Sequence, residues 1–384
     1  MKKILLSAAI AASFYSPSSL ADIRINGFAN LVGGYSNTDA DPDIYGFSDS
    51  VDFSNQSLFA VQLSGDVNEK VSATAQIISR GSNDFDTSFE WAYLTYSLSD
   101  NTEISAGRLR LPLFLYSESL DVGYSYHWIT APQTVYGILF NNLDGLRVRH
   151  TGYSAGIDYE FQGAYGVIEN KGIDVGGNGD IVADLKGTDT VLFSAQAAYE
   201  SYKLRAVYGR STVSLPFESL SQAVASFNQF DPVLADLFDF NEDTGVFYGF
   251  SLGFDNFDYF ASAEYTVAEV ADSNTPKDTN YYVTTGGRFG KYTPSVTYER
   301  RDGAGEIKFL DRVAALPAPL QPTVAATVSA FQIAQFDDFS ILSVGLRYDV
   351  DSQIALKGEV IQYNDRLNDE LDGEIFRVAA SYVF

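Results

Sequence analysis

Apolar and polar residues alternate along most of this chain with a period of two. In the last segment, every second residue counted back from the C-terminus is apolar, and the other register includes a serine and an arginine. The apolar register consists of Phe384, Tyr382, Ala380, Val378 and Phe376, and the other register contains Ser381 and Arg377. A period of two is typical of a β-strand with one apolar and one wetter face. The chain is therefore expected to end in such a strand.

The same alternation recurs from one end of the chain to the other, and the connectors between the alternating segments differ in length. Alternating segments include residues 23–35, 155–162, 246–254, 258–265, 342–349 and 354–360. Short connectors lie near 66–70, 99–101, 151–153, 200–202, 255–256, 290–292 and 350–352. Long polar connectors lie at 36–55, 111–142, 166–188, 211–243 and 301–337. Counting strands between the connectors gives about 16, an even number as bacterial barrels require.

The sorting of connectors by length separates two β architectures. A soluble sandwich also alternates, with its apolar face inward, but it has no reason to place short turns at one end and long loops at the other. That layout is typical of outer-membrane barrels, and recurrent charges on the polar register suit a water-filled interior. A sheet in lipid must close, because an open edge would leave N–H and C=O groups unpaired. The pattern predicts an all-β fold: one transmembrane antiparallel β-barrel of about 16 strands over residues 22–384, with short periplasmic turns and long extracellular loops.

The facing of the fourth and fifth strands is left open by the pattern. Both registers are apolar in residues 89–98, so either Trp91 and Tyr93 or Leu94 and Tyr96 face the lumen. If the less favoured of these registers held, Phe89, Trp91 and Tyr93 would form an inward aromatic stripe, as in channels that conduct sugars.

The beginning of the chain predicts export. Lys2 and Lys3 precede a short apolar stretch at 4–14, and small residues precede Asp22. This order is typical of a secretory signal peptide, here residues 1–21, which is cleaved after Ala21. The apolar stretch is too short for a transmembrane anchor, which needs about 18 apolar residues. We expect export through the Sec pathway.

Composition excludes several classes of function. The chain has 50 acidic and 25 basic residues, whereas a nucleic-acid-binding protein needs a basic face. It has no cysteine, so disulfides, thiolate metal sites and cysteine nucleophiles are excluded. The two histidines, His127 and His150, have no flanking nucleophile motif, and no calcium-loop spacing occurs. We predict no enzymatic activity, no metal and no cofactor.

Barrel size predicts a channel. Barrels of 16 to 18 strands leave an aqueous lumen, whereas those with about 8 strands fill it with side chains. The first strand begins close to Asp22, so an N-terminal plug domain is not expected. The chain should conduct small hydrophilic solutes and ions by passive diffusion.

A run of motifs carries a resemblance to a known family. Gly107-Arg108-Leu109-Arg110 precedes a long connector through Asn142, and Asp144-Gly145-Leu146-Arg147-Val148-Arg149 follows it. With the signal peptide and the terminal Phe, this order resembles the trimeric general porins of Gram-negative bacteria. The resemblance implies a homotrimer in the outer membrane, in contact with lipid and lipopolysaccharide. It also implies that the assembly machinery recognises the last strand through Tyr382 and Phe384.

In that family the third extracellular loop folds inward and narrows the pore, and its acids face arginines on the wall. The resemblance implies that residues 111–142 are this loop. It makes Glu118 and Asp121 the loop acids, and it makes Arg108, Arg110, Arg147 and Arg149 the wall bases. Opposed rows of charge create a transverse field that orients polar solutes. The arginines of later strands are expected instead to pair with wall acids and stabilise the wall: Arg205, Arg288, Arg347 and Arg377. The enterobacterial loop signature Pro-Glu-Phe-Gly-Gly is absent.

The sequence leaves the ion selectivity and the exact function of the barrel open. Acids in the outer loops, such as Asp39, Asp41 and Asp43, favour cations, whereas the wall arginines favour anions, so ion selectivity is undecided. The alternatives to a general channel are a substrate-specific channel for anions, carboxylates or sugars, and a non-conducting adhesin or structural barrel. Residues 215–240 and 313–336 are rich in Ala, Leu and Phe, and we expect them to carry short helices folded against the barrel, with partner contact as the alternative.

Overall fold

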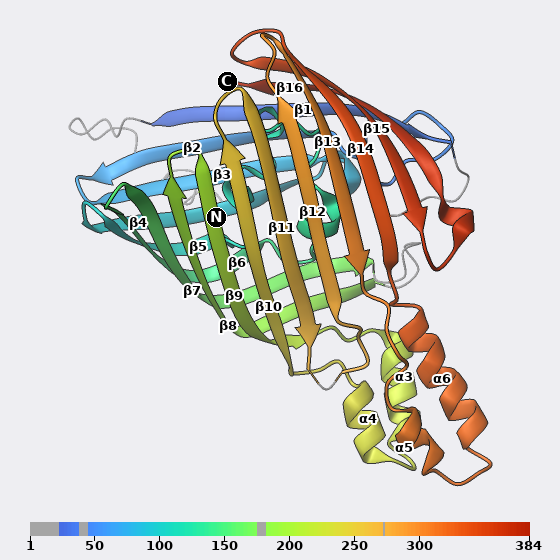
Figure 1. Ribbon diagram of the computed structural model, residues 1–384. Helices are drawn as coiled ribbons and strands as arrows, with labels where there is room; N and C mark the ends of the chain where they lie inside the picture. Colours follow the sequence, from blue (N-terminus) through green and yellow to red (C-terminus); the bar gives the residue numbers. More distant parts are fainter. Residues whose placement is uncertain (1–22, 38–44, 175–181, 272) are drawn as a thin grey trace, which may run out of the picture.

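Sixteen antiparallel strands form a closed barrel in the computed structural model (Figure 1). The structure describes residues 23–37, 45–174, 182–271 and 273–384, so the predicted signal peptide lies outside the described residues. Each strand pairs with its neighbours in sequence, and β1 pairs with β16 to close the sheet. The predicted barrel is therefore confirmed. The strands are β1 (Arg24–Ser36), β2 (Leu58–Asn68), β3 (Val71–Arg80), β4 (Thr87–Ser99), β5 (Thr102–Arg110), β6 (Asn142–Ser154), β7 (Ile157–Asp174), β8 (Val182–Tyr199), β9 (Tyr202–Ser214), β10 (Asp243–Asp255), β11 (Tyr259–Val270), β12 (Asp278–Gly287), β13 (Tyr292–Asp302), β14 (Asp338–Asp349), β15 (Ile354–Asp365) and β16 (Gly373–Val383).

The outside of the barrel is apolar, because alternate residues of each strand point to opposite faces of the sheet. Large apolar side chains that would be buried in a soluble sandwich are exposed here, as a lipid-facing surface requires. They include Leu31, Leu94, Leu146, Phe193, Tyr208, Phe250, Leu342 and Val378. Among the described residues, no helix combines the length and the apolarity that crossing a bilayer requires.

In strand β4, Trp91 and Tyr93 face the lumen, which is the alternative that the sequence pattern favoured less. Leu94 and Tyr96 are exposed on the outside, 53% and 42% respectively, whereas the rings of Trp91 and Tyr93 lie inward beneath arginines. A register shift between β3 and β4 makes Gln76 pair with Trp91 and Ile77 pair with Phe89. The extra residue, Glu90, turns the strand so that Phe89 faces outward, and the three-residue aromatic stripe does not form.

The long loops carry the helices. The β5–β6 loop, residues 111–141, holds two 3-10 turns, Ser117–Ser119 and Gly123–Ser125, and the short helix α2 (Gln133–Tyr136). The β9–β10 loop holds α3 (Glu218–Phe227) and α4 (Pro232–Phe238), and the β13–β14 loop holds α5 (Leu310–Ala314) and α6 (Gln321–Ile333). Further 3-10 turns are Gly81–Asn83 and Asp369–Leu371.

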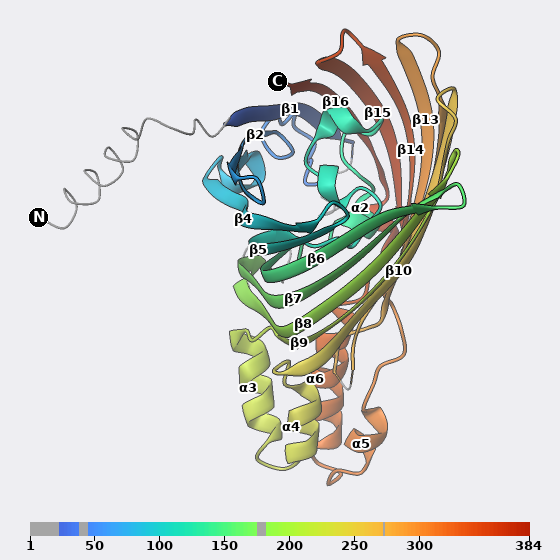
Figure 2. The same cartoon turned by 90° about the vertical axis from the view of Figure 1, so that its left-hand side faces the viewer.

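The helices of the two distal loops form one cluster that projects beyond the barrel (Figures 1 and 2). The helices were expected from the sequence, but they pack mainly on each other rather than on the barrel wall. Their shared core includes Leu220, Phe227, Leu234, Phe238, Val313, Val324 and Val328, and it extends to Ala183 and Leu185 at the start of β8.

Candidate constriction site

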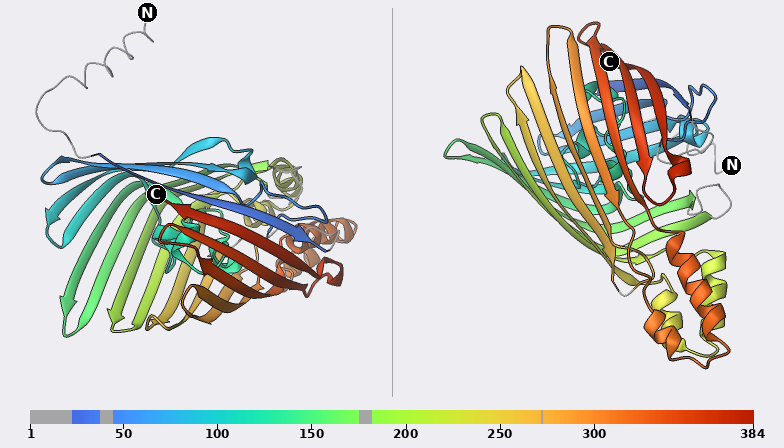
Figure 3. Two further views of the ribbon diagram at one scale, coloured as in Figure 1. Left: turned by 90° about the horizontal axis from the view of Figure 1, so that it is seen from above. Right: turned by 45° about the vertical axis from the view of Figure 1, so that its right-hand side comes forward.

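The β5–β6 loop folds into the barrel and crosses its interior (Figures 2 and 3). Its first residues pack against inward side chains of the wall, which buries apolar surface that would otherwise face water. Phe114 contacts Phe247 of β10 edge-on with ring centroids 5.9 Å apart, and Trp128 contacts Tyr282 of β12 in the same way at 5.6 Å. We call residues 111–141 the inner loop.

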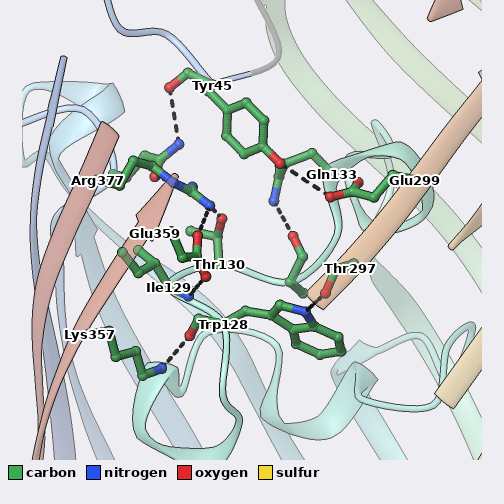
Figure 4. Close-up of polar contacts among 12 residues, drawn as sticks. Tyr45, Trp128, Ile129, Thr130, Gln133, Thr297, Glu299, Lys357, Glu359 and Arg377 are labelled. Atoms are coloured by element: carbon green, nitrogen blue, oxygen red, sulfur yellow. Dashed lines mark hydrogen bonds and ion pairs between the residues drawn. The ribbon is translucent and has the colours of Figure 1, made fainter. Parts of the chain in front are cut away.

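Three buried carboxylates of the wall accept backbone N–H groups of the inner loop. Glu264 on β11 accepts from Leu115 at 2.8 Å. Glu359 on β15 accepts from Ile129 at 2.8 Å (Figure 4). Glu299 on β13 accepts from Thr134 at 3.1 Å. These bonds satisfy backbone N–H groups of the loop, so β11, β13 and β15 hold the loop at three points.

Wall cations donate to backbone carbonyls of the same loop. The guanidinium of Arg347 donates to the carbonyls of Tyr124 and Tyr126, at 2.6 and 2.8 Å. The Lys357 ammonium donates to the carbonyls of Gly123, at 2.5 Å, and of Trp128 (Figure 4). Carbonyl groups that no strand or helix pairs are satisfied in this way.

Arg205 differs from the sequence expectation that it would pair with a wall acid. It is buried and donates to the carbonyl of Pro112, and no ion pair of Arg205 is found within the described residues. Arg347 pairs with Asp349 at 2.8 Å while it also binds the loop. Sequence alone could not show these roles, because the partners are backbone groups of a distant segment.

Arg288 and Arg377 lie against wall carboxylates. Arg288 forms a two-pronged pair with Asp255, with both N–O distances 2.8 Å. Arg377 pairs with Glu359 at 2.5 Å and donates to Thr130 of the inner loop at 2.8 Å (Figure 4). Both arginines therefore stabilise the wall, and Arg377 also helps to hold the loop.

A buried cluster of four charges ties the inner loop to the opposite wall. Asp121 of the loop pairs with Arg110 of β5 and, at 2.9 Å, with Arg80 of β3. Glu90 of β4 completes the cluster, 2.8 Å from Arg80 and 2.9 Å from Arg110. Burial opposes ionisation of Asp121, but the Arg110 and Arg80 guanidiniums outweigh it and hold the pKa of Asp121 below its ordinary value.

The structure brings together Arg110 and Asp121, as the resemblance implied, and adds two partners that the sequence analysis missed. Glu90 carried a usable signal, since it is the one charged residue of the segment 87–99. Arg80 carried none, because it ends a strand beside a short loop.

Arg108 does not lie in the lumen, which corrects the expectation. It pairs with Ala92 of β4 on one side and with Asp144 of β6 on the other. Both partners lie two residues from exposed leucines, Leu94 and Leu146, so Arg108 is on the outer face of the sheet. Its Nε lies 3.5 Å from a carboxylate oxygen of Asp144. The Gly107-Arg108 motif therefore places a charge pair on the outer surface.

The remaining three predicted residues are Glu118 on the inner loop and Arg147 and Arg149 on β6. Glu118 is exposed on the loop and interacts electrostatically with Arg149 and Arg205. Arg149 pairs with Glu160 of β7 at 2.6 Å. Arg147 has no ion-pair partner in the described part of the chain, and its guanidinium lies 5.9 Å from the centre of the Tyr93 ring.

Each of the two histidines lies beside a threonine hydroxyl. His127 of the inner loop lies 3.1 Å from the Thr284 hydroxyl, and His150 lies 2.9 Å from the Thr102 hydroxyl. Burial, together with the cations Lys357, Arg288 and Arg347, lowers the pKa of His127 well below its ordinary value. Over the residues that the structure describes, no three His, Cys, Asp or Glu side chains are grouped so as to hold a metal ion.

The fold is similar to those of solved outer-membrane proteins. The channel DcaP of Acinetobacter baumannii aligns with a TM-score of 0.57 at 12% identity, over 95% of this chain and 97% of that one. A loop-deletion mutant of OmpT, an outer membrane protein of Vibrio cholerae, gives 0.56 at 12% identity, over 95% and 100%. OmpF of Salmonella typhi, solved with daunomycin, gives 0.55 at 13% identity, over 95% and 98%. At these identities the likeness establishes the fold alone.

No curated sequence matches the chain significantly. The family model of Gram-negative porins, however, matches residues 7–369, which is most of the sequence. This chain therefore belongs to the Gram-negative porin family and is an outer-membrane channel for passive diffusion.

Proposed function

We propose that small hydrophilic solutes cross this barrel between the inner loop and the wall of β6, past Glu118 on one side and Arg147 and Arg149 on the other. The observation that carries the proposal is the open guanidinium of Arg147, which lies in the lumen without a carboxylate partner among the described residues. Most other arginines along the loop are occupied by loop carbonyls or by acids.

Opposed charges across a narrow passage create a field that orients water and polar solutes and penalises apolar ones. Arg149 shares its side of the passage with Glu160 and Glu103, whereas Arg147 adds an unmatched positive charge. We therefore propose weak selectivity, to which Arg147 contributes an attraction for anions.

Processing and assembly of the chain should follow the pattern of other exported barrels. Residues 1–21 would be removed on export, and residues 22–384 would form one barrel domain with 111–142 as the constriction loop. We propose a homotrimer in contact with lipid and lipopolysaccharide, whose last strand the assembly machinery reads through Tyr382 and Phe384. Support for the trimer comes from OmpT of Vibrio cholerae, which was solved in a trimer form and aligns with a TM-score of 0.52 at 11% identity. We propose that the protein is not an enzyme.

The experiment is single-channel recording of the purified protein in a planar bilayer under a salt gradient. Stepwise conductance with steps grouped in threes supports an open trimeric channel, and the reversal potential gives the ion preference. Silence from a folded, heat-modifiable barrel would contradict the proposal and favour a non-conducting structural barrel.

A further inference from the structure

Part of the barrel interior is dry where β14, β15 and β16 approach the long loops. A water-filled lumen is lined by polar side chains. Here, however, apolar and aromatic side chains take the inward register, each of them at most 4% exposed: Phe339, Ile341, Ile361, Tyr363 and Ile375. Other parts of the chain must therefore cover this stretch of the wall.

The cover comes from two loops. Residues 45–57 form the last part of the β1–β2 loop, and their aromatic side chains Tyr45 and Phe47 belong to the same apolar cluster as the wall residues. Ile129 of the inner loop belongs to this cluster too, and all three side chains are buried. Burial of these side chains excludes water from the space between the inner loop and the last strands.

The 45–57 segment is fixed to the backbone of β1. The N–H of Gly34 donates to the carbonyl of Asp52 at 2.9 Å, and the N–H of Asp52 donates back to the carbonyl of Gly34 at 3.0 Å. A Cβ at position 34 would lie 2.4 Å from the Phe47 ring, so this ring packs directly on the strand where no side chain intervenes. The segment is therefore a docked part of the barrel interior.

Tyr45 joins this segment to the groups that hold the inner loop. Its hydroxyl donates to one carboxylate oxygen of Glu299 at 3.2 Å, and the other oxygen of Glu299 accepts from the backbone N–H of Thr134 (Figure 4). The Arg377 guanidinium lies 4.4 Å from the centre of the Tyr45 ring and also donates to Thr130 of the inner loop. Tyr45 thus shares one partner on β13 and one on β16 with the inner loop.

We propose that the 45–57 segment is a second constriction element, which closes the lumen between the inner loop and β14–β16, and that Tyr45 positions this segment against the inner loop. Solutes are then confined to the side of the inner loop that faces β6. The size limit of the channel therefore depends on two loops rather than on one. This inference rests on the proposed function, because it assumes that the passage along β6 conducts.

The test opens the closed side in the full-length protein. Tyr45→Ala should raise the single-channel conductance at least about 1.5-fold, because ion flow increases with the diameter of the open passage. In liposome-swelling assays, the rate with raffinose relative to the rate with the smaller sugar arabinose should rise as well. Phe47→Ala should act in the same direction and decides the matter if Tyr45→Ala does not fold. Val51→Ala is the control, since Val51 lies in the same segment but is 65% exposed, and it should change neither quantity.

Tyr45→Phe separates the ring from the hydroxyl. It keeps the ring beneath Arg377 and loses only the hydrogen bond to Glu299, so it should retain the size limit of the wild type. A lower unfolding midpoint in Tyr45→Ala, with conductance and sugar ratio unchanged, would overturn the proposal, because Tyr45 would then stabilise the fold without bounding the channel. A folded wild-type protein that conducts nothing would refute the proposed function alone. Tyr45→Ala should then still conduct, and silence of this variant too would overturn the inference.

Discussion

Phe384 and Gly27 join the two ends of the barrel. The N–H of each residue donates to the carbonyl of the other at 3.0 Å, which closes β16 onto β1. The Phe384 ring covers Gly27 so closely that a Cβ at position 27 would lie 2.2 Å from a ring carbon. Phe59 and Tyr382 stack beside this ring, with centroids 6.4 and 5.6 Å away. The terminal residue thus packs the closing seam itself.

Gly27→Ala should weaken the closing seam. The added methyl group would also lie 2.8 Å from the carbonyl oxygen of Ala60, a backbone atom that cannot move aside easily. Overpacking of this kind costs about 1 to 3 kcal/mol, and urea unfolding in lipid vesicles would measure the loss. Gly358→Ala on β15 is the matched control, since nothing lies within 4 Å of its Cβ position. Equal stability of the two variants would show that the seam tolerates the methyl group.

Asp121→Ala should release the inner loop from the β3–β5 wall. The substitution leaves Arg80 and Arg110 to share the single carboxylate of Glu90, and removing one partner of a buried ion pair costs about 3 kcal/mol. We expect a larger and noisier single-channel current together with a lower unfolding midpoint. Glu118→Gln is the control, because Glu118 is exposed on the same loop and should change ion preference without loosening it. A quiet channel of unchanged conductance in Asp121→Ala would mean that the loop is held by the β11–β15 contacts alone.

Arg147→Gln should shift the reversal potential toward cation preference, because it removes the unmatched positive charge of the passage. The same measurement on Arg108→Gln should show almost no shift, since Arg108 lies on the outer surface beside Asp144. The two variants remove the same group from strands that pair with each other. A shift in Arg108→Gln as large as that in Arg147→Gln would contradict the facing of these residues.

The sequence predicted the barrel because the alternation of apolar and polar residues records which side of a strand meets lipid. It was less reliable about the facing of single residues. A shift of one residue moves a side chain to the opposite face, and the irregular pairing of β3 with β4 at Gln76 leaves no mark in the apolar pattern. The resemblance of the Gly107-Arg108 motif to porins predicted that Arg108 lies in the lumen, whereas the strand pairing places Arg108 on the outer face.

The loop contacts were beyond sequence reasoning for a different reason. Arg205 and Lys357 donate to backbone carbonyls, and every residue type carries a carbonyl, so no side-chain pattern identifies the partner. The contact of Asp121 with Arg110 was accessible because both ends of that contact are charged side chains near each other in the chain.

Arg312→Ala should loosen the helical cluster without affecting the barrel. Asp231 caps α4 by accepting from Val233 and Leu234, and it pairs with Arg312 of α5 at 2.5 Å, which links the two loops. Loss of this partly exposed pair costs about 1 kcal/mol. Limited proteolysis should then cut within 211–243 or 301–337 faster, while the strands stay protected. Arg210→Ala, which removes an exposed arginine from the neighbouring strand, should leave cleavage unchanged.

Acidification should destabilise the docked inner loop through His127. Burial and the nearby cations Lys357, Arg288 and Arg347 lower the pKa of this histidine when the loop is docked, whereas in the unfolded chain it titrates near its ordinary value of about 6.5. Below that pH, His127 is protonated in the unfolded chain but stays neutral in the folded protein, so the free energy of unfolding falls as the pH drops.

The expected loss from this histidine is about 1.4 kcal/mol between pH 7.5 and pH 5.5. His127→Gln can still hydrogen-bond the Thr284 hydroxyl but does not titrate, so urea unfolding at the two pH values should show a loss smaller by about that amount. All other titrating groups are shared by the two proteins, so the difference isolates His127. Identical losses would mean that His127 is protonated in the folded channel and that the inner loop leaves it open to water.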